Sequence, residues 1–86
     1  MERLVIGVIG NRGVVKRVLE GSIGASEIKN GVWLRGDIEF VQREVYDPVN
    51  GWKWNGVLFV DGCEKLCRER FVDIIKRLDW VWAKNI

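Results

Sequence analysis

A short run near the N-terminus, Arg3–Ile9, constrains the fold more than any other part of the sequence. It reads RLVIGVI, so nearly every position is apolar and the composition favours a strand. A strand that is apolar at successive positions buries both of its faces, which is typical of the centre of a sheet that is covered on two sides. We therefore expect a sheet that is built around this run.

The segment that follows Gly10 predicts a helix. Its apolar residues fall on one helical face: Val14, Val15, Val18 and Leu19. Asn11 is a suitable N-cap and Gly21 a suitable C-cap. Valine also favours strands, and the Asn-Arg-Gly sequence could close a hairpin. Residues 13–21 are therefore either helix or strand at this point, and we favour the helix.

The rest of the chain predicts strands, turns and a second helix. Asn30-Gly31 and Asn55-Gly56 each predict a hairpin turn, and Asp37–Tyr46 between them predicts a strand. Residues 63–79 carry apolar side chains at a spacing of three to four, which predicts an amphipathic helix. The C-terminal residues, Asp79–Ile86, form either a last strand or the frayed end of that helix.

This order of elements indicates an α+β fold. We expect a small, mostly antiparallel sheet with two helices on one face, in the order β-α-β-β-β-α with a possible last strand. If residues 13–21 form a strand, the alternative is a small β-barrel with a C-terminal helix. A chain of 86 residues suits a single domain that spans 1–86.

The composition removes most catalytic chemistry. The chain has no histidine and only two cysteines, which excludes imidazole catalysis and a four-thiolate zinc site within one chain. Cys63 and Cys67 fall on the apolar stripe of the predicted helix, so we expect buried core residues rather than a redox pair. We therefore predict that the protein is not an enzyme, and we expect no catalytic residue, metal or cofactor.

Membrane and secretion signals are missing from the sequence. No apolar run approaches the roughly 20 residues that a membrane-spanning helix needs, and Met1–Arg3 leads into the first strand without a signal-peptide cleavage site. Secreted mini-domains usually carry more than two cysteines. These features predict a cytoplasmic protein with no membrane association.

Three glycines, Gly7, Gly10 and Gly13, mark the junction between the first strand and the predicted helix. Backbone amides in such a loop bind phosphate and other anions, and the residues that would do so are Gly10, Asn11, Arg12 and Gly13. The spacing departs from the dinucleotide loop, which requires glycine where Ile9 stands, and from the P-loop. We favour the alternative that the glycines serve the turn and close packing.

Five tryptophans in 86 residues form the most unusual feature of the composition. Together with neighbouring cations they define the candidate binding residues: Arg12, Lys16, Arg17, Trp33, Arg35, Trp52, Lys53 and Trp54. Tryptophan is enriched at protein interfaces, aromatic and basic residues together suit single-stranded nucleic acid, and indoles also fill cores. We expect a non-enzymatic interaction module that self-associates as a homo-oligomer, or binds a protein partner, through a Trp-rich surface. Nucleic-acid binding is the alternative.

Overall fold

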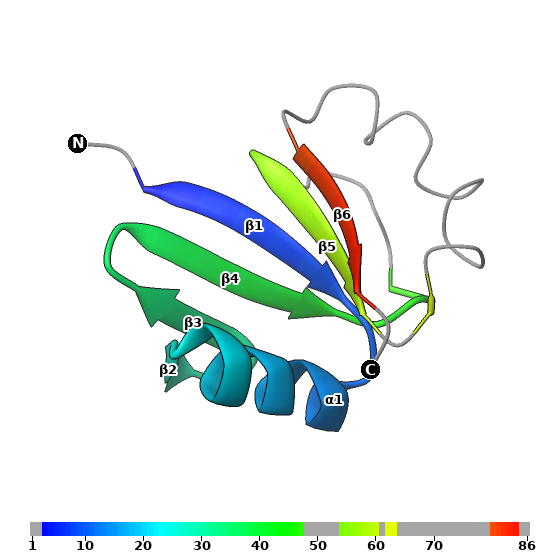
Figure 1. Ribbon diagram of the computed structural model, residues 1–86, viewed down its shortest axis with the longest axis horizontal. Coiled ribbons are helices and arrows are strands. Elements are labelled where there is room, and N and C mark those ends of the chain that lie inside the picture. Colours follow the sequence, from blue (N-terminus) through cyan, green and yellow to red (C-terminus); the bar gives the residue numbers. More distant parts are fainter. Residues whose placement is uncertain (1–2, 48–53, 61, 64–79, 85–86) are drawn as a thin grey trace.

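The computed structural model describes residues 3–47, 54–60 and 62–63 and the backbone of residues 80–84 (Figure 1). In this part of the chain six strands form one open sheet in the order β2-β3-β4-β1-β5-β6. The strands are β1 (Leu4–Ile9), β2 (Ser26–Lys29), β3 (Val32–Arg35), β4 (Ile38–Arg43), β5 (Gly56–Val60) and β6 (Trp80–Lys84). Because the sheet is open, with β2 at one edge and β6 at the other, it argues against the alternative of a closed barrel.

The sheet is mixed in its strand directions. The expected antiparallel pairing is found in the β2-β3-β4 meander. β1 pairs in parallel with both β4 and β5, and β5 pairs in parallel with β6. Parallel neighbours require long connections, since the chain must return to the same end of the sheet before each strand begins.

β1 is the central strand, as its apolar sequence predicts. Ile6 and Val8 face the helix and belong to the main core, while Gly7 and Ile9 face the other side of the sheet and are also buried. From Ile6 to Ile9 both faces of the strand are therefore removed from water, which explains why this part of the run lacks the polar alternation of a half-exposed strand.

The helix after β1 is confirmed, and the strand alternative for residues 13–21 is wrong. Asn11 caps it, because its side-chain Oδ1 accepts a hydrogen bond of 2.9 Å from the backbone N–H of Gly13. The helix begins as α1 (Arg12–Arg17) and continues as the π-helical segment η1 (Val18–Ile23). The expected C-cap at Gly21 is wrong, since the chain turns at Gly24, which adopts a left-handed φ of 79°.

α1 and η1 cover one face of the sheet, and the main core lies between them and the strands (Figure 1). The three fully buried helical side chains are Val15, Val18 and Leu19. They pack in a cluster with residues of four strands and the turn after η1: Ile6, Val8, Ala25, Trp33, Phe40, Leu58 and Val60. One helix is described; the second expected helix, 63–79, falls on residues that lie outside the described part except for Cys63, which is in a turn.

The two Asn-Gly pairs behave differently. Asn30-Gly31 forms the predicted turn between β2 and β3, with Gly31 at a left-handed φ of 80°. The predicted hairpin at Asn55-Gly56 is wrong. Asn55 extends the pairing with β1 instead: its N–H donates to the Val5 carbonyl (2.7 Å) and its side-chain oxygen accepts from the Val5 N–H (2.8 Å). At the C-terminus, the alternative of a last strand is confirmed by β6.

Gly7 is required because an indole lies directly on the backbone of β1. A Cβ atom built at Gly7 would be 2.2 Å from the Trp54 ring. We predict that Gly7→Ala lowers the free energy of unfolding by about 1–3 kcal/mol, since the ring must move from its packed position. Urea denaturation measures this change.

Gly21→Ala is the matched control, because a Cβ atom at this exposed helical glycine has no heavy atom within 4 Å. Alanine has the higher helix propensity, so the control is expected to be neutral or to stabilise by up to about 1 kcal/mol. Equal stabilities of the two variants would contradict the packing of Trp54 on β1.

Candidate functional site

The predicted Trp-rich surface is only partly within the described residues. Trp33 is fully buried, at 0% exposure, so its indole offers no surface for stacking or for a partner. Trp54 is half-buried against Gly7. Trp52 and Lys53 lie outside the described residues, and the side chains of β6 are not among those described. The structure therefore places Trp33 in the core instead of at the predicted binding site.

Trp33 is the centre of a polar network that joins the helix to the β2-β3 hairpin. Its Nε1–H donates to the Glu20 carboxylate (2.9 Å), and the Arg12 guanidinium lies 5.8 Å from the centre of its ring. Arg12 forms an ion pair with Glu27, whose carboxylate also accepts from the Gly31 N–H. Arg12 was a predicted binding residue, and the structure gives it this partner in the fold. No motif in the sequence identifies Glu20 or Glu27 as members of the network.

The glycine loop uses its own polar groups within the protein. The Gly10 N–H donates to the Arg43 carbonyl (3.0 Å), and the Gly13 N–H donates to Asn11. A Cβ atom at Gly10 would be 2.4 Å from a methyl group of Val60, so this glycine permits close packing of β1 and β5. The donors that an anion would require from Gly10, Gly13 and Arg12 are thus already engaged.

The carboxyl ends of the parallel strands are filled by neighbouring side chains. In open sheets, ligands bind at this edge where the strand order reverses, which here is β1 between β4 and β5. The Gln42 amide donates to the Gly10 carbonyl (2.8 Å). The buried Cys63 thiol donates to the carbonyls of Ile9 (3.0 Å) and Val60 (2.8 Å). Cys63 is therefore a buried residue as predicted, whereas Cys67 lies outside the described residues.

The described residues contain neither a metal-ligand cluster nor a membrane-spanning helix. Among the described residues, no three cysteine or carboxylate side chains gather at a spacing that would hold a metal ion. None of the described helical residues form a helix that is long and apolar enough to cross a membrane.

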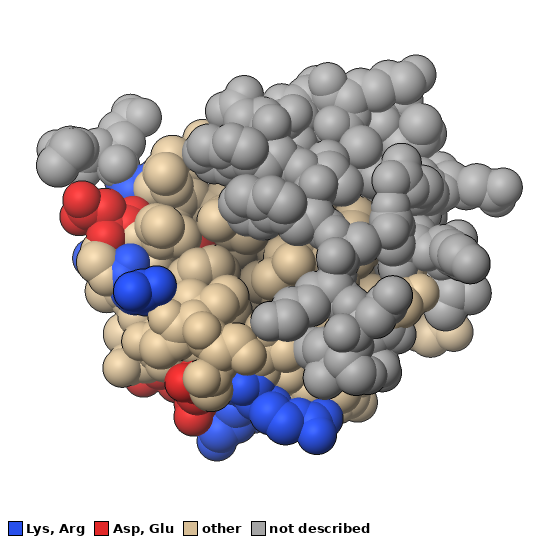
Figure 2. Space-filling view, viewed as in Figure 1, with Lys and Arg blue, Asp and Glu red and all other residues tan. Residues whose placement is uncertain are grey.

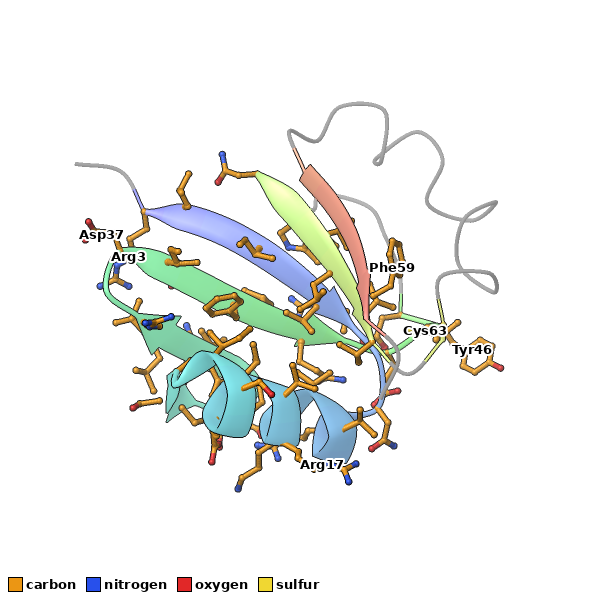
Figure 3. All side chains as sticks on the ribbon, in the orientation of Figure 1. Arg3, Arg17, Asp37, Tyr46, Phe59 and Cys63 are labelled. Carbon is orange, nitrogen blue, oxygen red and sulfur yellow. The ribbon has the colours of Figure 1, made fainter. Side chains whose placement is uncertain are left out.

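The predicted basic residues separate into two regions. Lys16 and Arg17 are exposed on α1, where Figure 2 shows lysine and arginine gathered at the lower edge of the molecule. Arg17 points away from the sheet in Figure 3. Arg35 is exposed next to Asp37, at the end of the sheet where Leu4 begins β1. Arg35 therefore does not join the α1 residues in one site.

The sheet face opposite α1 carries apolar side chains that keep part of their surface in water. They alternate with the core residues of β1, β3 and β4 and comprise Val5, Leu34 and Val41. Glu39 and Arg43 lie on either side of Val41 on the same face of β4. Beyond β3, at the sheet edge, Ile28 of β2 is 49% exposed. We call these six residues the open-face patch.

Comparisons with other proteins add no assignment. No protein-family model, curated protein or solved structure matches this chain. The open-face patch and the basic side of α1 are therefore interpreted from their own geometry.

The bond between Trp33 and Glu20 offers a direct test of the network. Glu20→Ala removes the acceptor of the indole N–H, so we expect a loss of about 1–2 kcal/mol in the free energy of unfolding. Glu20→Gln keeps an oxygen that can accept the same hydrogen bond, and it should retain most of the stability. If both variants unfold at the wild-type urea concentration, the bond does not stabilise the helix on the hairpin.

Proposed function

We propose that this chain is a non-enzymatic interaction module that associates with a second copy of itself through the open-face patch. The observation that carries the proposal is the incomplete burial of Val5, Leu34 and Val41 beside the exposed Ile28. Apolar side chains that keep surface in water favour association, because covering them removes apolar area from water.

The charges of the patch favour a second copy as the partner. Glu39 and Arg43 flank Val41 at equal distances along β4, and Glu39 also forms an exposed ion pair of 3.3 Å with Arg3 of its own chain. If two copies pack with their β4 strands antiparallel across a two-fold axis, Glu39 of each copy faces Arg43 of the other. A two-fold interface is built from this kind of self-complementary surface. The small net charge of +2 adds little repulsion between copies.

Association through the face is favoured over extension of the sheet at β2. β2 has four residues, carries Glu27 and Lys29, and changes register between them. Short length, charge and a bulge are the features by which edge strands avoid pairing with other strands. None of these three features occurs at Val5, Leu34 or Val41, which lie on the face of the described sheet.

The tryptophans contribute less to this proposal than the sequence predicted. Of the described indoles only Trp54 keeps exposed surface, and it lies on the same face of the sheet as Val41, since Gly7 pairs with Val41. We further propose a cytoplasmic location, which the low count of two cysteines supports because secreted mini-domains usually carry more.

Ile28→Asp tests the association. The substitution places a charge in the proposed interface, and we expect the dissociation constant of the dimer to rise at least about tenfold, because burial of an isoleucine contributes about 1.5–3 kcal/mol. Sedimentation equilibrium over a range of protein concentrations measures the change.

Tyr46→Asp is the control for this variant. Tyr46 is 85% exposed and extends from the turn after β4, away from the open-face patch (Figure 3). The Tyr46→Asp variant should therefore associate like the wild type. A wild-type chain that sediments as a monomer at high micromolar concentration would refute the proposal.

A pair of charge reversals tests the two-fold arrangement. Glu39→Arg alone and Arg43→Glu alone each place like charges opposite each other, so each should weaken association. The double variant restores opposite charges across the axis and should recover much of the lost affinity. If the double variant is as weak as the sum of the two single variants, Glu39 and Arg43 do not meet across a two-fold axis.

A further inference from the structure

The outer side of α1 carries a positive charge that the fold leaves uncompensated. α1 contains three cations, Arg12, Lys16 and Arg17, and no acidic residue. Lys16 and Arg17 are exposed, and within the described residues neither forms an ion pair. Figure 2 shows a basic area along the lower edge of the molecule, where Figure 1 places α1.

The acidic side chains that could neutralise these cations are held elsewhere. Glu20, one turn after Lys16, accepts the hydrogen bond of the Trp33 indole. Glu27 is engaged by Arg12 and the Gly31 N–H. Glu20 thereby reaches to the β3 indole and Glu27 lies on β2, so Lys16 and Arg17 are the exposed cations of α1 that no described ion pair neutralises.

The surface around the cations is also accessible to a large partner. Gly13 and Gly21 are exposed on the helix and place no side chain beside Lys16 and Arg17. A Cβ atom at Gly21 would have no heavy atom within 4 Å. A rod-shaped polyanion can therefore approach the helix along its length.

From these observations we infer that the outer side of α1 binds the phosphate backbone of a nucleic acid. Lys16 and Arg17 contact phosphates directly, and Arg12 adds to the field because its side chain is 43% exposed despite its ion pair. Contacts to phosphates carry no base specificity, so this binding is independent of sequence.

A nucleic acid fits this surface better than an anionic membrane does. A helix that lies on a membrane inserts exposed apolar or aromatic side chains between the lipids. The apolar residues of α1 and η1 instead face the core, and the large exposed hydrophobic residues among those described are Leu4, Ile28 and Tyr46, which lie outside both segments.

Fluorescence anisotropy with a labelled 20-nucleotide single strand and the matching duplex tests the inference on the full chain. Affinity should fall with salt, with a slope of log K against log salt of about −1.4 for the single strand and about −1.8 for the duplex, as two phosphate contacts require. Lys16→Glu and Arg17→Glu should each weaken binding several-fold and reduce the duplex slope by about one.

Arg35→Glu is the matched control, because it makes the same change in charge at an exposed cation next to Asp37 and away from α1. It should keep the wild-type slope and bind much like the wild type. Circular dichroism verifies that all three variants are folded, and Ile28→Asp should still bind, since this surface is separate from the open-face patch.

Three results would overturn the inference. The first is that the wild type binds neither nucleic acid at about 20–50 mM salt, a range in which phosphate contacts are strong. The second is that Arg35→Glu weakens binding as much as the α1 variants do, which would indicate a nonspecific effect of net charge. Binding to phosphatidylserine vesicles without binding to either nucleic acid would identify a membrane surface instead.

Discussion

The burial of the Trp33 indole is the interaction on which the rest of the described structure depends. An indole buries roughly 150–250 Å² of surface, which corresponds to about 4–6 kcal/mol of hydrophobic free energy. Its N–H would be costly to bury without a partner, and Glu20 on η1 supplies one. Arg12 covers the ring from the start of the helix. One side chain of β3 thus fixes both halves of the helix on the hairpin.

The same network determines the charge of the molecular surface. The helix carries three cations, Arg12, Lys16 and Arg17, and one carboxylate, Glu20. Glu20 is engaged by the Trp33 indole and Arg12 pairs with Glu27 of β2, while Lys16 and Arg17 remain outside. The packing of a buried tryptophan and the electrostatics of an exposed surface are therefore two results of one arrangement.

The sequence predicted the elements whose signals are local. β1 follows from its continuous apolar run, the start of α1 from Asn11 beside the valine stripe, and the β2-β3 turn from Asn30-Gly31. Predictions failed where a distant residue decides the structure. Asn55 resembles a turn residue, but Val5, 50 positions away, offers it both a donor and an acceptor. The parallel pairing of β1 has the same origin, because nothing within β1 specifies the direction of β4 or β5.

The site residues also divide into those that local sequence predicts and those that distant residues determine. Exposure of Lys16 and Arg17 could be expected from their place opposite the valine stripe of the helix. The burial of Trp33 could not, since it depends on which face of the β2-β3 hairpin meets the helix. The open-face patch had no sequence signal of its own, because Leu34 and Val41 look like core residues until the sheet shows which of its faces the helix covers.

The position of β1 in the sheet has a consequence for how the chain is made. β1 is synthesised first, yet its two neighbours begin at Ile38 and Gly56. At about 5–20 residues per second, the second neighbour follows β1 by roughly 3–10 s. Until β4 has been made, the apolar β1 segment has neither strand partner available, and until β5 has been made it has only one. Pairings between such distant segments also fold slowly, because a long loop must close before they form. The nascent chain is therefore most prone to aggregate before β5 has been made, and a chaperone that holds its N-terminal residues would act in that interval.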